Sequence, residues 1–251
     1  MGSHYATAQS LETIKQLAVE LGEGFLELLW PTRCIGCEET GILLCDQCNA
    51  RLPRIDRSLA CPHCGAPLGH IICTECYGAD GPREFSFSQA VAAMEFQGTA
   101  ARLVVGYKDQ HERRLAQLLA QLLLQVIPDD WIAWTDVITY IPADARALRQ
   151  RGFDHMQAVA SALAALMGQP AANLLVKYAV TDQRLLGRAA RQQNSSAAFS
   201  ARFSGECHLP PGKVLLIDDV LTTGATLDAA ATTLLDAGFD EVRVAVIARV
   251  W

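Results

Sequence analysis

Four copies of Cys-x-x-Cys constrain this chain more than any other feature of its sequence. They hold eight of the nine cysteines and lie between positions 34 and 76. Two thiolates spaced in this way on a tight turn can reach one ion at about 2.3 Å, and two such turns complete a tetrahedron. The pattern therefore predicts two zinc sites of four thiolates each, with the ligands Cys34, Cys37, Cys45, Cys48, Cys61, Cys64, Cys73 and Cys76.

Two alternatives stay open for these cysteines. A sequential assignment puts the first four on one zinc and the last four on the other, whereas a cross-braced assignment joins pair one with three and pair two with four. A redox dithiol or an iron–sulfur cluster competes with zinc, although four copies in one compact run favour zinc. A closed four-thiolate site leaves no position for water, so both sites are expected to be structural.

Charge and hydropathy exclude several classes of protein. The 251 residues carry 27 acids against 21 bases, a net charge of -6, which argues against a surface that binds nucleic acid everywhere. Residues 31–80 hold four bases against six acids, which favours a scaffold or protein-docking role for the cysteine module. No run approaches the ~20 apolar residues of a membrane span, and without a signal peptide the chain is expected in the cytoplasm.

The pattern of apolar residues predicts three parts. An amphipathic helix is expected in residues 1–30, a double zinc ribbon in 31–80, and an α/β domain in 81–251. In the last part strands alternate with helices, which predicts a mainly parallel sheet flanked by helices. The expected strands are 90–96, 137–141, 174–178, 214–217 and 242–247; the expected helices are 100–107, 112–126, 153–167 and 226–237, with a polar loop before residue 153.

The most informative stretch follows the apolar strand at 214–217. Asp218 and Asp219 come at its carboxyl end, where open α/β sheets bind ligands, and small or hydroxylic residues then lead into a helix. Backbone N–H groups and hydroxyls of such a loop converge on a phosphate at the helix N-terminus. The two acids would repel a phosphate, so they suit a neighbouring hydroxyl-bearing group such as a ribose. One acid alone would be an ordinary helix cap.

This stretch resembles the phosphoribosyl-pyrophosphate (PRPP) loop of type I phosphoribosyltransferases. With the paired cysteines ahead of it, Leu29-Trp30-Pro31 opening their module and Arg151-Gly152-Phe153 before a helix, the chain resembles the competence-associated, GntX-like ComF family. A further block of that family is similar to Thr181, Gln183, Arg191 and Asn194. The chain departs from the family pattern at Asp154-His155, where Asn and Gln are usual, and after Lys108, where Gly-Asp is missing.

The resemblance implies a role for each matching residue. Asp218 and Asp219 would hold the ribose hydroxyls and stabilise positive charge on the ribose during catalysis. The remaining PRPP-binding residues would be Val220, Leu221, Thr222, Thr223, Gly224, Ala225 and Thr226. Pyrophosphate would be held by Arg146, Arg149, Arg151 and Gly152. A flexible loop with Thr181, Gln183, Arg191 and Asn194 would close the site, and Mg²⁺ would accompany PRPP.

Charge in this region agrees with anion binding. Residues 140–202 hold eight bases against three acids within a chain that is acidic as a whole.

The sequence leaves three functions open for this chain. The chain is expected to transfer phosphoribosyl from PRPP to an unknown acceptor and release pyrophosphate. It could instead bind PRPP as a regulator without turnover, or handle single-stranded DNA beside competence proteins. The sequence contains no recognisable signature for the acceptor.

Overall fold

The computed structural model describes residues 31–78, 81–110, 112–178, 198–202 and 212–251. The chain divides into two compact units, residues 1–51 and 52–251. In the smaller unit the description covers the first cysteine cluster and α2 (Asp46–Ala50). The helix predicted within residues 1–30 lies outside the described residues. None of the described helices combines the length and the hydropathy that a membrane span requires.

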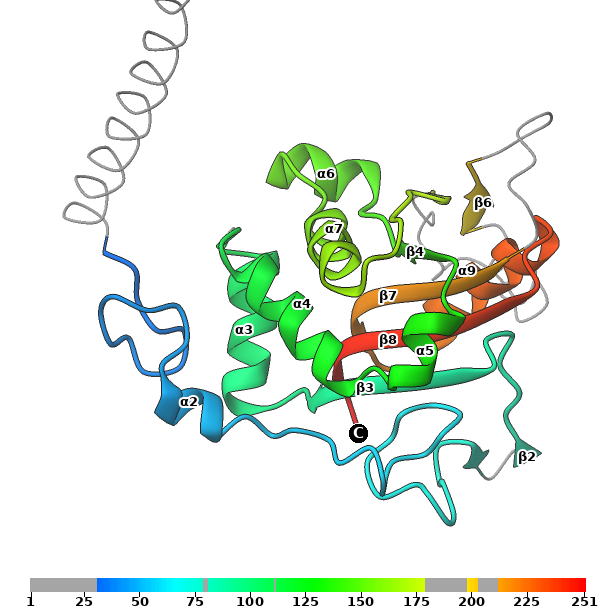
Figure 1. Cartoon of the computed structure of the whole chain (residues 1–251), viewed down its shortest axis with the longest axis horizontal. Coiled ribbons are helices and arrows are strands. Elements are labelled where there is room, and N and C mark those ends of the chain that lie inside the picture. Colours follow the sequence, from blue (N-terminus) through cyan, green and yellow to red (C-terminus); the bar gives the residue numbers. More distant parts are fainter. Residues whose placement is uncertain (1–30, 79–80, 111, 179–197, 203–211) are drawn as a thin grey trace, which may run out of the picture. The chain divides into compact units, whose positions relative to one another are not determined.

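The larger unit is built on a parallel sheet with the strand order β3-β8-β7-β4. These strands are β3 (Gln89–Glu95), β8 (Glu241–Arg249), β7 (Lys213–Leu221) and β4 (Val137–Tyr140). Figure 1 shows α9 on one face of this sheet and α3, α4 and α7 on the other. Because parallel strands need crossover helices, the alternating pattern correctly predicted an α/β fold of this kind.

The remaining described elements connect or border this core. The helices that cover the sheet are α3 (Gly98–Lys108), α4 (Leu115–Val126), α7 (His155–Met167) and α9 (Ala225–Asp236). Two short helices, α5 (Asp129–Trp134) and α6 (Ala145–Arg151), flank β4 along the chain. Two small antiparallel pairs complete the set: β1 (Tyr77–Gly78) with β2 (Gly81–Pro82), and β5 (Leu175–Lys177) with β6 (Phe199–Ala201).

The centre of β7 is buried on both faces because helices cover both sides of the sheet. Val214 and Leu216 pack into one apolar cluster with Leu227 and Leu234 of α9. Side chains alternate along a strand, so the intervening Leu215 points to the face covered by α4 and α7. The pairing of β7 with β8 continues without a bulge to the end of both strands.

Two expectations for this region were wrong. The stretch before residue 153 is not a loop, because α6 forms there. Asp144 caps its start by accepting a hydrogen bond from the N–H of Ala147 at 2.7 Å, and Gly152 ends it in the left-handed conformation at φ 72°. Strand β7 also runs four residues beyond Ile217, so the two acids lie within the strand rather than after it.

The second cysteine cluster belongs to the larger unit and packs on the edge of its sheet. The backbone beside Arg54 runs antiparallel to β3, with Ile55 N–H donating to Ala93 O at 3.1 Å and Glu95 N–H donating to Pro53 O at 2.9 Å. This pairing covers the outer edge of β3, which would otherwise expose unpaired backbone groups. The predicted domain bounds at residues 30 and 80 stay predictions.

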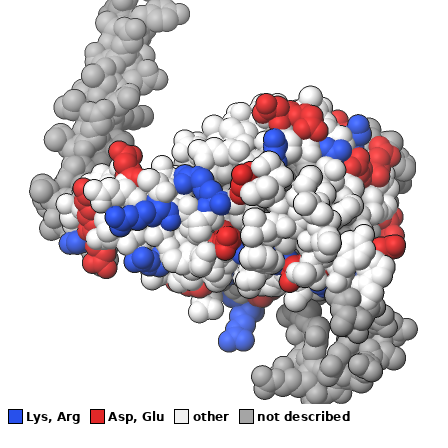
Figure 2. All heavy atoms as spheres, turned by 90° about the horizontal axis from the view of Figure 1, so that it is seen from below, with Lys and Arg blue, Asp and Glu red and all other residues white. Residues whose placement is uncertain are grey.

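The described surface carries charge of both signs. Figure 2 shows Lys and Arg interspersed with Asp and Glu on the face drawn, without one continuous basic surface. This agrees with the net charge of -6 for the whole chain.

Candidate functional sites

The eight paired cysteines form two clusters suited to metal. Within each, the four Sγ atoms lie within 4.8 Å of one another. Cys37 and Cys45 are 3.6 Å apart at sulfur, and Cys61 and Cys76 are 3.8 Å apart. Sulfurs at about 2.3 Å from a tetrahedral zinc are separated by about 3.8 Å, whereas a disulfide needs about 2.05 Å. The clusters therefore fit zinc, and their grouping confirms the sequential assignment: Cys34, Cys37, Cys45 and Cys48, then Cys61, Cys64, Cys73 and Cys76.

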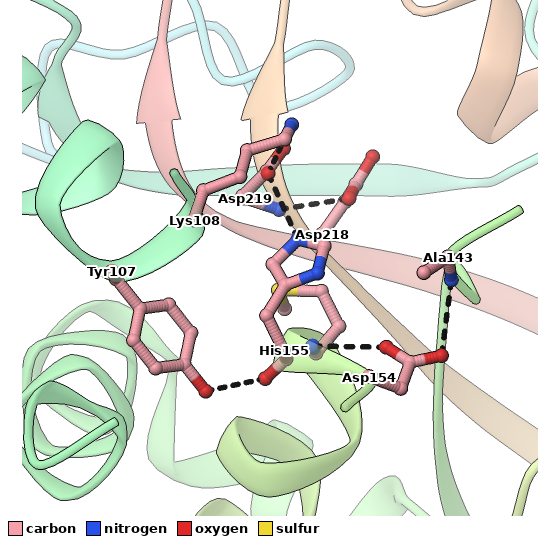
Figure 3. Close-up of polar contacts among 8 residues, drawn as sticks. Tyr107, Lys108, Ala143, Asp154, His155, Asp218 and Asp219 are labelled. Carbon is pink, nitrogen blue, oxygen red and sulfur yellow. Dashed lines mark hydrogen bonds and ion pairs between the residues drawn. The ribbon is translucent and has the colours of Figure 1, made fainter. Parts of the chain in front are cut away.

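The acid pair of β7 is split between the two faces of the sheet. Side chains two residues apart in a strand lie on the same face of the sheet, so Asp218 lies with Leu216 on the α9 face. Asp219 lies on the face covered by α3 and α7. Asp219 is 5% exposed and accepts a hydrogen bond from Lys108 Nζ at 2.6 Å. The Nε2 atom of buried His155 lies 3.1 Å from the same oxygen. Figure 3 shows the side chains of Lys108 and His155 gathered on Asp219 while Asp218 turns away.

The first turn of α7 places His155 beside the sheet. Asp154 caps this helix by accepting a hydrogen bond from the N–H of Met156 at 3.2 Å. Its second carboxylate oxygen accepts from the N–H of Ala143 at 3.0 Å, which ties α7 to the chain that leaves β4. One carboxylate thus fixes where the helix begins and how its first residue is oriented (Figure 3).

The last turn of α3 completes the arrangement. Lys108 is the final residue of this helix, and the preceding Tyr107 donates its hydroxyl to the backbone oxygen of His155 at 2.5 Å. Tyr107 is buried, so this bond satisfies its only side-chain polar group. Helices α3 and α7 are therefore locked together at the point where both reach Asp219.

The two acids differ in charge as a result. Burial and the neighbouring charge of Asp219 raise the pKa of Asp218 to about 8. Burial also raises the pKa of Asp219, but the hydrogen bond from His155 and the charge of Lys108 outweigh it and hold that pKa well below its usual range. The pair therefore combines one permanently ionised carboxylate with one that carries a proton at neutral pH.

The loop after β7 ends in a helix N-terminus suited to an anion. Gly224 occupies the N-cap position of α9 at φ 82°, a conformation that glycine adopts without strain, and no side chain caps the helix. A Cβ at this position would lie 2.8 Å from the ring of Phe85. Asp228 in the first turn accepts from the N–H of Ser86 at 2.6 Å and so does not occupy the N-terminus. The N–H of Ala225 makes only a long contact, 3.4 Å to Oγ1 of Thr223, and a helix N-terminus has further N–H groups without intrahelical partners, so this end of α9 suits an anionic ligand.

The predicted pyrophosphate residues lie on α6. Arg146 and Arg149 are both exposed and three residues apart, so they share one side of the helix. Helix α6 follows the carboxyl end of β4, which is the neighbour of β7 at the same edge of the sheet. The side chain of Arg151 is outside the described part, and so are the predicted flexible-loop residues Thr181, Gln183, Arg191 and Asn194.

Sequence reasoning missed Lys108, His155 and Phe85 as parts of this site. His155 stands at one departure from the ComF pattern and Lys108 directly precedes the other, which was the available signal. Their meeting at Asp219 depends on how α3 and α7 pack, and spacing along the chain does not contain that information. Phe85 had no signal, since a single aromatic before a strand is ordinary.

We predict that the two zinc sites differ in their effect on stability. Cys37→Ser and Cys64→Ser should each lower the zinc content of the purified chain from two ions to one. Cys64→Ser should also lower the melting temperature of the larger unit by roughly 10 °C, because its cluster packs within that unit. Cys37→Ser should leave that transition in place. Metal analysis and calorimetry test this, and equal effects of both variants on the larger unit would contradict it.

We predict opposite stability effects for the two acids. Between the ordinary pKa near 3.8 and the raised value of about 8, folded Asp218 holds a proton that the unfolded chain has released. Wild-type stability therefore falls as pH rises through that window, so Asp218→Asn should be stabilising, increasingly from about pH 5 to pH 8. Asp219→Asn should destabilise by about 2–4 kcal/mol at neutral pH, because Lys108 and His155 lose their partner. Thermal melts from pH 5 to 9 test this, and the reverse order would contradict it.

Family models match two parts of the chain. A double zinc ribbon domain matches residues 25–77, and a phosphoribosyl transferase domain matches residues 158–250. Two solved structures are similar to parts of the chain. Glutamine PRPP amidotransferase from B. subtilis is 24% identical over 53% of this chain and 25% of its own, with a TM-score of 0.36. Orotate phosphoribosyltransferase from Aeropyrum pernix is 19% identical over 67% and 70%, with a TM-score of 0.33.

Curated relatives match most of the chain. Competence protein F of Haemophilus influenzae is 27% identical over 229 residues, which is 86% of this chain and 96% of the relative. The DNA utilization protein YhgH of Salmonella typhi is 28% identical over 209 residues, or 80% and 88%. These matches agree with the resemblance to the ComF family. The chain is therefore a homologue of competence protein F and the YhgH proteins, with a double zinc ribbon ahead of a phosphoribosyltransferase domain.

Proposed function

We propose that this chain binds PRPP with Mg²⁺ at the carboxyl end of β7 and transfers phosphoribosyl to an acceptor still to be identified. One observation carries the proposal: an ionised acid, a second acid and an uncapped helix N-terminus follow one another within eight residues of one strand and its loop. Anionic and neutral oxygens suit a ribose, and helix N–H groups suit a phosphate.

Each part of PRPP has a counterpart among these residues. The loop from Thr222 to Thr226 would hold the 5′-phosphate on its N–H groups. Asp218, which is partly buried, would meet the ribose hydroxyls. Bound Mg²⁺ would offset the charge of the pyrophosphate and would keep mainly phosphate and water ligands.

Transfer would need positioning and charge more than covalent help. The bond between C1′ of the ribose and the pyrophosphate oxygen breaks, that oxygen keeps the electron pair, and the acceptor nucleophile forms a new bond at C1′. Positive charge grows on the ribose as the bond breaks, and the permanently ionised Asp219 would stabilise it. Arg146 and Arg149 would take up the departing pyrophosphate, since guanidinium groups bind phosphates bidentately.

Binding without turnover is a second candidate. The observation that favours it is that Asp219 already accepts from Lys108 and lies against His155, so part of its charge is neutralised within the protein. Release of pyrophosphate from PRPP in the presence of purine and pyrimidine bases separates the two. Release above the rate without protein supports the transferase, and PRPP binding without release supports the regulator.

The names of the relatives favour a role in DNA utilization for this chain. Such a role could include contact with single-stranded DNA or with competence proteins. DNA binding through the backbone phosphates would be lost as salt rises, whereas PRPP binding, which releases far fewer counterions, would change less. A gel-shift titration with single-stranded DNA at two salt concentrations tests this role, and absence of any shift at low salt counts against direct DNA contact.

We predict that Asp218→Ala combined with Asp219→Ala abolishes PRPP binding. Loss of both carboxylates removes the hydroxyl contacts and the fixed charge, so the dissociation constant should rise by about 100-fold or more, or about 3 kcal/mol. Calorimetry with PRPP and Mg²⁺, performed below the melting temperature of the variant, measures this. Asp240→Ala is the matched control, because this exposed acid lies before β8 at the opposite end of the strands. Unchanged affinity in the double variant would refute the site.

A further inference from the structure

A buried arginine contacts the loop from Thr222 to Thr226, where the 5′-phosphate is proposed to bind and which is called the phosphate loop below. Arg249, the last residue of β8, is 3% exposed. Its Nη1 atom donates to the backbone oxygens of Leu221 at 3.2 Å and Thr222 at 2.5 Å, and it also donates to that of Val250. Its Nε atom has no hydrogen-bond partner among the described residues. Burying a guanidinium with an unpaired N–H costs free energy, so packing alone does not account for an arginine here.

The contacts of Arg249 set the direction of the loop N–H groups. In a planar trans peptide the C=O of one residue and the N–H of the next point in opposite directions. Because Arg249 draws the oxygens of Leu221 and Thr222 toward itself, the N–H groups of Thr222 and Thr223 point away from it. Those N–H groups belong to the loop where the 5′-phosphate is proposed to bind. Arg249 therefore orients the donors without touching the ligand.

The other arm of Arg249 reaches the second cysteine cluster. Its Nη2 atom lies 3.3 Å from Oε2 of Glu75, a residue between the ligands Cys73 and Cys76. The turn that carries Glu75 is closed by the N–H of Cys76, which donates to the oxygen of Cys73 at 3.2 Å. A metal held by these cysteines would fix this turn, and the position of Glu75 would in turn fix Arg249.

A second route joins the same cluster to the same loop. Phe85 packs against the cysteines and also lies beneath Gly224, where it leaves no room for a Cβ. The next residue, Ser86, donates its N–H to Asp228 at 2.6 Å, and its hydroxyl lies 2.7 Å from that of Thr232. The segment between the cluster and β3 is thus fastened to the first turns of α9.

We propose that the second four-cysteine module positions the phosphate loop, with Glu75 and Arg249 as the positioning residues that connect the two. The first module, in the other compact unit, has no such part in this proposal. The effect on ligand affinity rests on the proposed PRPP site. The effect on the order of the loop does not depend on any ligand.

The experiment compares Glu75→Ala and Arg249→Lys with the wild type in the full chain loaded with zinc. Glu75→Ala should weaken PRPP binding about threefold to tenfold in the presence of Mg²⁺. Arg249→Lys should weaken it more, because a lysine is a single point of charge and cannot span two carbonyls and a carboxylate. Hydrogen exchange of the amides of residues 222–225 should be faster in both variants without ligand. The zinc content should stay at two ions.

Two control variants test whether the changes in PRPP affinity and amide exchange are specific to Glu75 and Arg249. Glu38→Ala removes an exposed acid next to Cys37 of the first cluster, and Arg243→Met removes an arginine of β8 that packs on Trp134. Both should retain wild-type affinity and exchange. Adding Glu75→Ala to Arg249→Lys should weaken binding no further, since both act through one contact.

The possible outcomes are distinguishable. Wild-type affinity and wild-type exchange in Glu75→Ala and Arg249→Lys would overturn the inference while leaving PRPP binding intact. Equal weakening by Glu38→Ala would also overturn it, because the effect would then be one of charge alone. If the wild type fails to bind PRPP, the proposed function fails. Faster exchange of residues 222–225 in the two variants would still support the positioning role.

Discussion

Strand β7 and the helices α3 and α7 of the larger unit meet at the carboxylate of Asp219. It lies at the carboxyl end of the central strand β7, buried, with Lys108 of α3 and His155 of α7 on one oxygen. A buried charge is tolerated only when it is paired and hydrogen-bonded, so both helices must reach this point for the sheet edge to be stable. The same requirement leaves Asp218, on the other face, as the acid that is free to change its protonation.

Much of the fold could be predicted from the sequence because its signals are local. The apolar runs of β7 and β8 are long enough to mark buried parallel strands, and the cysteine spacing marks two metal clusters. Helix α6 was missed although Asp144 and Gly152 are ordinary caps, because the polar residues between them were interpreted as a loop. The partners of Asp219 could not be predicted, since they come from helices 111 and 64 residues away and meet only through packing.

The two cysteine clusters have similar chemistry but different surroundings. The first lies in the smaller unit, and the second is built into the unit that carries the candidate PRPP site. A structural metal normally contributes to the stability of its own module. Here Glu75 contacts Arg249, which holds carbonyls of the loop that follows β7, and Phe85 lies against Gly224 of that loop, so the order of the second module and that of the loop are physically linked. The double zinc ribbon is therefore not one uniform appendage.

We propose that a phosphorylated ribose binds where β7 passes into α9. A crystal structure of the chain with PRPP and Mg²⁺ measures this directly. The 5′-phosphate should lie within hydrogen-bond distance of the N–H groups from Thr222 to Thr226, with the ribose hydroxyls on Asp218. Density for PRPP elsewhere, or a loop whose N–H groups turn away from the bound phosphate, would contradict it.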